Sequence, residues 1–277
     1  MEYKIHQHLS NEPMLKVNAF IIEAAQELVI VDTTLTMSDS KALKKKADEL
    51  RKPIAGLIYT HGHPDHVAGA VNIITNIDTP IYALASVKKL MADTEAAKHQ
   101  QWAGMFGEEW VPKWIYPNNI VADKQELTIA GLQFRVLDLG SGGDCDANSI
   151  WLLEGEHPVA FLGDFVYHNN HTYMADGSIL RWMANIERYS ETLRKYNTYY
   201  IGHGAPCNYE ALEKQRNYFI TYCAELLKAT DGSAILNDSD RRLFEESMLA
   251  KFPDYGCQFM VALAADKVAA ELVSLSH

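Results

Sequence analysis

The chain has 277 residues, of which 48% are hydrophobic and 22% are charged, a composition typical of a soluble globular protein with a sizeable core. Its 25 basic and 36 acidic residues give a formal charge of −11, which would repel nucleic acids and anionic membranes. The four cysteines form no Cys-x-x-Cys pair, so neither a zinc ribbon nor a disulfide framework is expected. The start of the chain lacks the apolar stretch of a signal peptide, and no run is long enough to span a membrane. We therefore expect a cytoplasmic protein that acts on a small molecule and has neither nucleic-acid nor membrane partners.

The first third of the chain alternates β-prone and helical segments. Strands are predicted over residues 16–22, 28–32, 54–59 and 80–84, and helices over 38–52 and 67–77. Ser38 is typical of a helix cap, and Pro53 ends the helix that follows it. This alternation predicts an α/β domain built in layers.

A dense group of polar residues follows the strand over 54–59, in the sequence His61-Gly62-His63-Pro64-Asp65-His66. In an extended segment, residues two apart face the same way, so His61 and His63 are expected to point at one centre. Pro64 is tolerated in a first helical turn, which would bring Asp65 and His66 to a neighbouring position. Nitrogen and oxygen ligands in two such groups suit zinc or a similar transition metal. A single loop histidine is usually only solvated, so it is the cluster that predicts a metal site.

Three later positions carry further groups that are able to bind a metal. A glycine-rich loop over 139–147 contains Asp144 and Cys145, whose carboxylate and thiolate are both metal ligands. Asp164 ends an apolar strand, where catalytic groups often gather, and His203 stands between two glycines after a short strand.

Aromatic residues gather in two places that are candidates for contacts with a substrate. The segment over 86–117 begins as a helix and continues into tryptophan-rich sequence, which either folds onto the core or forms a lid or substrate wall. The second place follows Asp164 closely, and its polar residues either contact a substrate or lie at the surface. The substrate-side candidates are Trp110, Trp114, Tyr167, His171 and Tyr173. A wall of this kind predicts a substrate with an apolar moiety.

The end of the chain has a helical pattern. Helices are predicted over 209–229, 239–252 and 259–276, with Ser239 as a cap. This divides the chain into a metal-binding core over 1–206 and a C-terminal helical extension over 207–277 that packs on it. The extension either covers the pocket or forms the contact of a homodimer.

The motif His61-x-His63-x-Asp65-His66 after a strand resembles the signature of the metallo-β-lactamase superfamily. The other parts of that signature follow in the expected order at Asp32, Asp144 or Cys145, Asp164 and His203. The resemblance extends from Asn18 to about Pro206. It implies an αββα sandwich, two mixed β-sheets between helical layers, with the C-terminal helical segment appended.

The same resemblance implies two divalent metal ions, zinc in the first instance, with manganese or iron as alternatives. The implied ligands are His61, His63, Asp144 and Asp164 for the first ion, and Asp65, His66, His203 and the shared Asp164 for the second. Zinc β-lactamases and glyoxalase-II-like enzymes have a histidine where this chain offers Asp144 or, with a different count along the loop, Cys145. Asp32 would support the metal loop from behind by orienting a ligand histidine.

The resemblance further implies a metallo-hydrolase whose metal-bound water, as a hydroxide bridging the two ions, attacks an ester, lactone, thioester or amide carbonyl. Asp65 would also relay a proton during turnover. A phosphodiesterase-type metallo-hydrolase is the alternative within this class. From other classes, a di-iron redox protein is disfavoured because His63 stands where such proteins carry glutamate, and an inactive binding protein of the same fold stays open.

Overall fold

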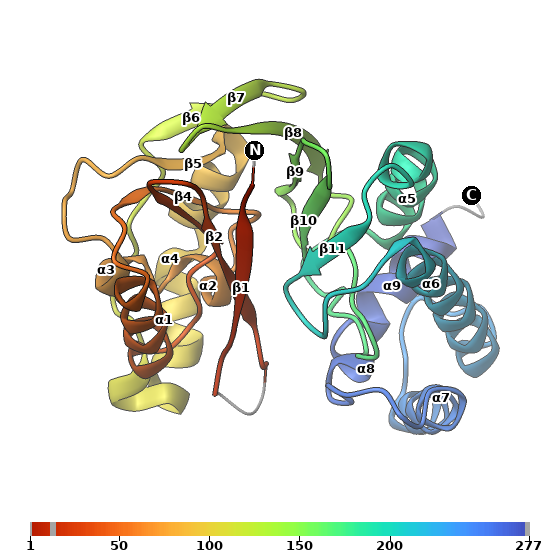
Figure 1. Ribbon diagram of the computed structural model, residues 1–277. Helices are drawn as coiled ribbons and strands as arrows, with labels where there is room; N and C mark the ends of the chain where they lie inside the picture. Colours follow the sequence, from red (N-terminus) through yellow and green to blue (C-terminus); the bar gives the residue numbers. More distant parts are fainter. Residues whose placement is uncertain (1, 12–14, 275–277) are drawn as a thin grey trace.

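Two β-sheets packed face to face form the centre of the fold, and helices cover their outer sides (Figure 1). A computed structural model describes residues 2–11 and 15–274 of the chain. The first sheet has the strand order β1-β2-β3-β4-β5-β6, and the second has the order β11-β10-β9-β8-β7. Both sheets are mixed, since β3 to β6 pair in parallel in the first and only β10 and β11 do so in the second. The αββα sandwich expected from the sequence is confirmed.

The elements have the following bounds. The first sheet consists of β1 (Lys4–Leu9), β2 (Asn18–Glu23), β3 (Leu28–Val31), β4 (Ile54–Ile58), β5 (Ile81–Leu84) and β6 (Asn119–Val121). The second consists of β7 (Glu126–Ile129), β8 (Leu132–Gly140), β9 (Asn148–Leu153), β10 (Val159–Gly163) and β11 (Thr198–Ile201). The helices described are α1 (Met37–Glu49), α2 (Pro64–Val67), α3 (Ala70–Ile73), α4 (Ala85–Phe106), a short 3-10 turn η1 (Gly107–Glu109), α5 (Ile179–Leu193), α6 (Tyr209–Thr230), α7 (Asp238–Lys251), α8 (Met260–Leu263) and α9 (Ala265–Ser274).

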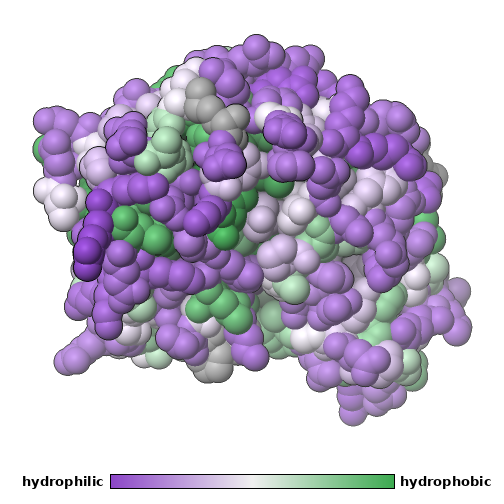
Figure 2. Space-filling model, in the orientation of Figure 1, coloured by the Kyte–Doolittle hydropathy of each residue, from purple (hydrophilic) through white to green (hydrophobic). Residues whose placement is uncertain are grey.

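Helices α1, α3 and α4 lie outside the first sheet, whereas α5 and α6 lie outside the second (Figure 1). None of the helices in the described ranges combines the length and the apolar character that crossing a membrane requires. The face shown in Figure 2 is predominantly hydrophilic, as expected for a chain with a formal charge of −11.

Several helix boundaries differ from the prediction because the capping groups lie elsewhere. Helix α1 is capped by Thr36, whose hydroxyl accepts a hydrogen bond from the backbone N–H of Asp39 at 3.2 Å, and not by Ser38. In α7 the cap is Asn237, which forms a capping box with Asp240, and not Ser239. The helix predicted over 67–77 is two short helices, α2 and α3, separated at Gly69. The last predicted helix is likewise divided into α8 and α9, and its residues 275 and 276 lie outside the described range.

Aromatic packing joins the two sheets across the interior. The ring of Phe20 on β2 lies 5.8 Å from that of Phe161 on β10 and 5.1 Å from that of Tyr200 on β11. On the outer side of the second sheet, Trp182 of α5 packs edge-on against Phe219 of α6 at 4.9 Å. The C-terminal helices therefore share one apolar core with the second sheet and α5. The division of the chain at residue 206 stays a prediction.

Backbone hydrogen bonds tie the two sheets together where their polar loops meet. The N–H of Ser149, in β9, donates to the carbonyl oxygen of Thr60, directly after β4, at 2.9 Å. The N–H of Asn18, in β2, donates to the carbonyl oxygen of Gly202, directly after β11, at 2.8 Å. The segments that follow β4 and β11 are thereby held at the same edge of the sandwich.

The variant Gly69→Ala tests the close packing behind the loop that follows β4. A Cβ atom at residue 69 would lie 1.9 Å from the carbonyl oxygen of Thr33, which belongs to backbone and cannot move aside easily. We expect the free energy of unfolding, measured in urea, to fall by roughly 1–3 kcal/mol. Gly104→Ala in α4 is the matched control, because no atom lies within 4 Å of its Cβ and alanine favours a helix. Equal stability of the two variants would contradict this packing argument.

Candidate metal centre

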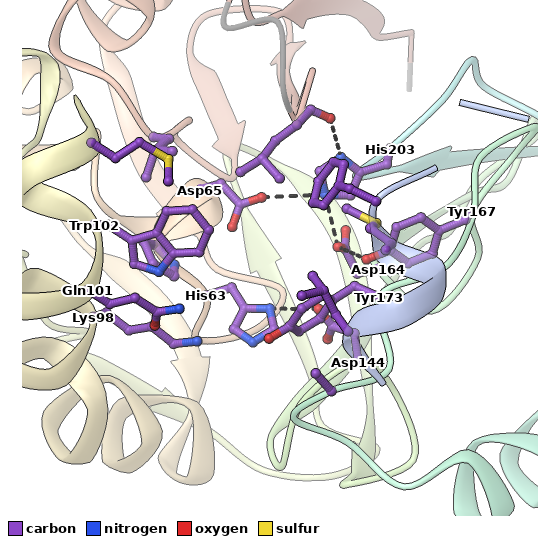
Figure 3. A pocket seen from close by; sticks show the side chains of 18 residues that line it. His63, Asp65, Lys98, Gln101, Trp102, Asp144, Asp164, Tyr167, Tyr173 and His203 are labelled. Atoms are coloured by element: carbon purple, nitrogen blue, oxygen red, sulfur yellow. Dashed lines mark hydrogen bonds and ion pairs between the residues drawn. The ribbon is translucent and has the colours of Figure 1, made fainter. Parts of the chain in front are cut away.

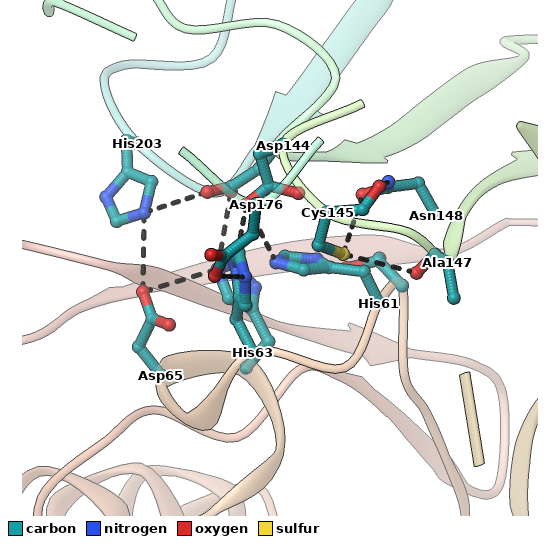
Figure 4. Close-up of polar contacts among 12 residues, drawn as sticks. His61, His63, Asp65, Asp144, Cys145, Ala147, Asn148, Asp176 and His203 are labelled. Atoms are coloured by element: carbon teal, nitrogen blue, oxygen red, sulfur yellow. Dashed lines mark hydrogen bonds and ion pairs between the residues drawn. The ribbon is translucent and has the colours of Figure 1, made fainter. Parts of the chain in front are cut away.

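Four segments bring seven buried polar side chains to one place between the sheets. Figure 4 labels His61, His63, Asp65, Asp144 and His203 among them. The loop after β4 and the first turn of α2 supply His61, His63, Asp65 and His66. Asp144 comes from the loop between β8 and β9, Asp164 follows β10, and His203 follows β11. Strand ends at one edge of the sandwich therefore meet, although the residues are far apart in the sequence.

Six of the seven side chains form two ligand groups of three. The first ligand group is His61, His63 and Asp144, and the second is Asp65, His66 and His203; within each, the ligand atoms lie within 4.8 Å of one another. In the first group, Asp144 Oδ2 lies 2.6 Å from His63 Nδ1 and 3.4 Å from His61 Nε2. In the second, Asp65 Oδ2 lies 3.4 Å from the Nε2 atom of His203 and 3.5 Å from that of His66.

Asp164 lies between the two groups. Its Oδ1 atom is 3.3 Å from His66 Nε2, and its Oδ2 atom is 3.1 Å from His203 Nε2. It also forms a third cluster of ligand atoms with His61 and His66, within the same 4.8 Å limit. A single carboxylate is thus in position to serve both groups.

Several atoms that face this centre contact one another as ion pairs but make no well-aligned hydrogen bond to any described residue. They are His61 Nε2, His66 Nε2, both carboxylate oxygens of Asp144 and Asp164 Oδ1. A buried polar atom without a hydrogen bond is costly, and such atoms rarely gather at one point without a reason. Imidazole nitrogens and carboxylate oxygens are the ligands that divalent transition metals take in proteins. The residues present therefore fit a metal centre with two adjacent positions.

The outer ring nitrogens of three histidines are held by fixed partners. Asp32 Oδ2 lies 2.8 Å from His66 Nδ1, and the same carboxylate accepts hydrogen bonds from the N–H and hydroxyl of Thr60. His61 Nδ1 lies 3.1 Å from the Thr60 hydroxyl. His203 Nδ1 donates to the carbonyl oxygen of Leu15 at 2.8 Å. Such partners turn the opposite nitrogen of each ring towards the centre, and Asp32 lies behind the metal loop as the resemblance implies.

Burial works against charge at the centre, but the opposite charges there outweigh it. Burial raises the pKa of Asp164, yet His203 and His66 hold that pKa well below its usual range. Burial lowers the pKa of His203 and His66, yet Asp164 holds both well above their usual range. Asp144 behaves in the same way, because the two histidines beside it lower its pKa to about 2 against the effect of burial. Ionised carboxylates that face protonated imidazoles are a setting in which bound cations replace protons.

The structure separates the two candidates for the third ligand of the first group. Asp144 faces His61 and His63, whereas none of the clusters of ligand atoms found among the described residues includes Cys145, whose Sγ atom lies 3.5 Å from the carbonyl oxygen of Ala147. Burial, with a further contribution from Asp144, raises the pKa of the Cys145 thiol well above its usual range. Because a metal deprotonates a thiol that it binds, the contacts and not this pKa favour Asp144 as the third ligand, and Cys145 stays the alternative.

A cavity of about 420 Å³ opens onto both ligand groups (Figure 3). His63, Asp65, Asp144, Asp164 and His203 lie in its wall. Apolar side chains make up much of the remaining wall, namely Leu15, Leu35, Trp102, Met105, Phe259, Met260 and Leu263. Lys98 and Gln101 of α4 add polar groups at its side.

Three of the predicted substrate contacts lie outside the wall of this cavity. Trp110 is buried with its Nε1 atom donating to His99 Nδ1 at 2.8 Å, and Trp114 is buried with its backbone N–H donating to Glu95 at 2.8 Å. His171 is enclosed by aromatic rings of the C-terminal segment, with its Nδ1 atom 3.0 Å from the hydroxyl of Tyr218. None of these three lines the cavity, because each is taken up by packing elsewhere.

Two predicted contacts, Tyr167 and Tyr173, do line the cavity. Lys98, Trp102 and Met105 of α4 also line it, inside the segment over 86–117 predicted as a possible lid or wall. None of the three is among the predicted substrate contacts, although they follow one another at the spacing of a single helix face. Phe259 and Leu263 are not among those contacts either, and no local signal marks them, because only the packing of α8 brings them to the cavity. The lid predicted over 86–117 is therefore narrower, since the part of α4 from Lys98 to Met105 forms the wall.

The chain belongs to the metallo-beta-lactamase superfamily, whose sequence profile matches residues 13–203. Solved structures of this superfamily have the same fold. A metallo-beta-lactamase family protein from Thermus thermophilus superposes with a TM-score of 0.69 at 17% identity, over 98% of this chain and 93% of that one. The metallo-beta-lactamase from Pontibacter korlensis superposes with a TM-score of 0.62 at 18% identity, over 79% of this chain and 98% of that one.

Curated relatives are named as hydrolases of two kinds. The chain is 25% identical over 150 residues to a linear primary-alkylsulfatase from Pseudomonas sp., covering 44% of this chain but 28% of that protein. It is 24% identical over 195 residues to an alkyl/aryl-sulfatase from Saccharomyces cerevisiae, of which it covers 30%. It is 21% identical over 203 residues to a hydroxyacylglutathione hydrolase from Prochlorococcus marinus, covering 73% of this chain and 71% of that protein. The chain thus spans less than a third of the length of the sulfatases that it matches.

Separate replacement of Asp144 and Cys145 tests the assignment of the first ligand group. We expect Asp144→Ala to lose one of two bound metal ions per chain, because the group would keep only its two histidines. Cys145→Ala should bind both ions, since no cluster of ligand atoms among the described residues includes its sulfur. Metal content after equilibrium dialysis, measured by elemental analysis on folded protein, decides between them. Loss of metal from the Cys145 variant alone would contradict the assignment.

Proposed function

We propose that the protein is a zinc-loaded, dinuclear metallo-hydrolase that cleaves an ester-type bond in a small substrate with an apolar moiety. The observation that carries the proposal is that two ligand groups, with Asp164 between them, line one wall of a largely apolar cavity. The superfamily membership and the relatives named as hydrolases support the same conclusion.

The ligand groups and Asp65 have different roles in the proposed reaction. Divalent ions in the two groups would supply Lewis acidity and activate water for attack at neutral pH. Asp65 lines the cavity with its carboxylate held between His66 and His203, so it is in position to accept a proton from the attacking group. The buried centre limits access of bulk water, which strengthens each electrostatic contact made there.

Two tyrosines provide neutral hydrogen-bond donors beside the ligand groups. The Tyr167 hydroxyl donates to Asp164 Oδ2 at 2.5 Å, and its ring stacks on that of His203 at 5.2 Å. The Tyr173 ring meets His63 edge-on at 5.6 Å. Burial and nearby carboxylates raise the pKa of both hydroxyls, so both stay protonated and able to donate. We assign Tyr167, whose one O–H is donated to Asp164, to holding that carboxylate, and Tyr173 to orienting the substrate at the cavity wall.

The cavity wall and the relatives together narrow the substrate class. The carboxylic ester, lactone, thioester and amide substrates expected from the sequence stay within the proposal, and sulfate esters of apolar alcohols join them because two relatives are named as sulfatases. Lys98 is the one lysine or arginine among the described residues that line the cavity. A phosphodiesterase that takes nucleic acid would need a longer basic groove, so this alternative is disfavoured. The cytoplasmic location and the homodimer stay predictions.

A substrate panel with metal analysis tests the proposed function. The purified protein would be assayed against carboxylic esters, lactones, thioesters, sulfate esters and phosphodiesters that share the same octyl group. We expect hydrolysis of at least one carboxylic or sulfuric ester type, loss of activity on removal of metal with a chelator, and recovery with zinc. Full occupancy by zinc without turnover of any of these substrates would contradict the proposal, and a coloured di-iron centre would favour the redox alternative.

The apolar wall on α4 should determine preference for long-chain substrates. Trp102→Ala removes a large ring from the cavity wall, so we expect kcat/KM for an octyl ester to fall roughly tenfold, about 1.4 kcal/mol, mainly through KM. The kcat/KM for an ester with a two-carbon group in place of the octyl group should change little, because so short a group does not reach the wall. Leu227→Ala, an exposed apolar position on α6, is the control. An equal loss of kcat/KM for short and long substrates would show that Trp102 does not contact the octyl group of the substrate.

A further inference from the structure

His63 differs from the other three histidines in the partner of its outer ring nitrogen. Its Nδ1 atom faces Asp144 at 2.6 Å, while its Nε2 atom lies 3.2 Å from Asp176 Oδ2 (Figure 4). The partners of the other three are buried or are backbone atoms, whereas the Asp176 side chain is 38% exposed and comes from the loop between β10 and α5. The orientation of one ligand ring therefore depends on a residue near the surface.

Lys98 holds that carboxylate from the other side of the cavity. Its Nζ atom lies 2.9 Å from the same Oδ2 atom of Asp176, and its side chain is only 15% exposed. Lys98 belongs to α4, one turn from Trp102, so it lies on the helix face that forms the cavity wall (Figure 3). An exposed ion pair would contribute little, but this one is mostly covered and shares its oxygen with a ligand histidine.

Asp176 contacts the ring edge opposite the first ligand group. None of the three clusters of ligand atoms found among the described residues includes it. A carboxylate that accepts the Nε2–H of a histidine keeps the proton on that nitrogen and leaves the Nδ1 lone pair free to bind a metal. The edge-on ring of Tyr173, 5.6 Å from His63, limits rotation of the imidazole from a further side.

We propose that Asp176 is a positioning residue for His63 and that Lys98 anchors Asp176, so that metal affinity in the first ligand group depends on the position of α4. The helix that forms the apolar wall is linked to the centre through Lys98, Asp176 and His63 in turn. The proposal rests on the metal-dependent function proposed above and goes beyond it. It assigns roles to two residues outside the ligand set.

The test is zinc affinity in variants of the full-length protein, measured by competition with a chromophoric chelator. We expect Asp176→Ala to lower the affinity for one of the two zinc ions 10- to 100-fold and to leave the affinity for the other unchanged. A loss of this size is usual when the outer partner of a ligand histidine is removed. Lys98→Met, which approximately keeps the length of the side chain, should lower the affinity for the same ion by a smaller factor. Asp176→Glu should recover part of the affinity, because it restores a carboxylate.

Matched controls come from the same helix. Lys89 pairs with Asp93 on an exposed part of α4, and Lys89→Met and Asp93→Ala should leave both zinc affinities unchanged. The absorption spectrum of the cobalt-substituted protein gives a second readout, since only the Asp176 and Lys98 variants should alter the bands of one ion. Wild-type zinc affinity in folded Asp176→Ala would overturn this inference alone. Wild-type protein that binds no zinc at all would overturn the proposed function as well.

Discussion

The burial of four imidazoles and three carboxylates within a few ångströms is the constraint on which the structure depends. Removing so many ionisable groups from water is costly unless each faces an opposite charge or a ligand. Asp164 offsets part of this cost, because its two oxygens face His66 and His203. Several inner atoms form ion pairs but no hydrogen bond among the described residues, and a bound cation would satisfy them.

The sandwich supplies the rigidity that such a centre needs. The ligands lie just beyond strand ends, and hydrogen bonds between Ser149 and Thr60 and between Asn18 and Gly202 fix the two sheets beside them. Close approach of the backbone matters as well. A Cβ atom at Gly202 would lie 1.8 Å from Asp164 Oδ1, so only glycine lets the segment before His203 reach the carboxylate.

Prediction from the sequence succeeds where a feature is local and fails where packing decides. Strand and helix geometry explains why His61, His63, Asp65 and His66 converge, whereas the αββα fold was implied only by the resemblance of the ordered motifs to the superfamily. The choice between Asp144 and Cys145 depends on the path of a glycine-rich loop, which the residue types leave open. The tryptophans illustrate the limit, since Trp110 and Trp114 pack into the core and Trp102 faces the cavity. All three are tryptophans of one aromatic-rich segment, so residue type does not distinguish them. Only the path of the chain, with Trp102 on α4 and the other two beyond it, determines which one faces the cavity.

The cavity wall explains why membership of the superfamily does not determine the substrate. The profile match ends at residue 203, yet Phe259 and Leu263 in the cavity wall lie beyond it, in and beside α8. Trp102 and Met105 of the remaining apolar wall belong to α4, which contributes none of the seven candidate ligands. Changes in either helix can alter the shape of the cavity and leave the ligand groups intact. The exception is Lys98, because its contact with Asp176 gives α4 a connection to His63, so changes in this wall are not fully independent of the metal centre.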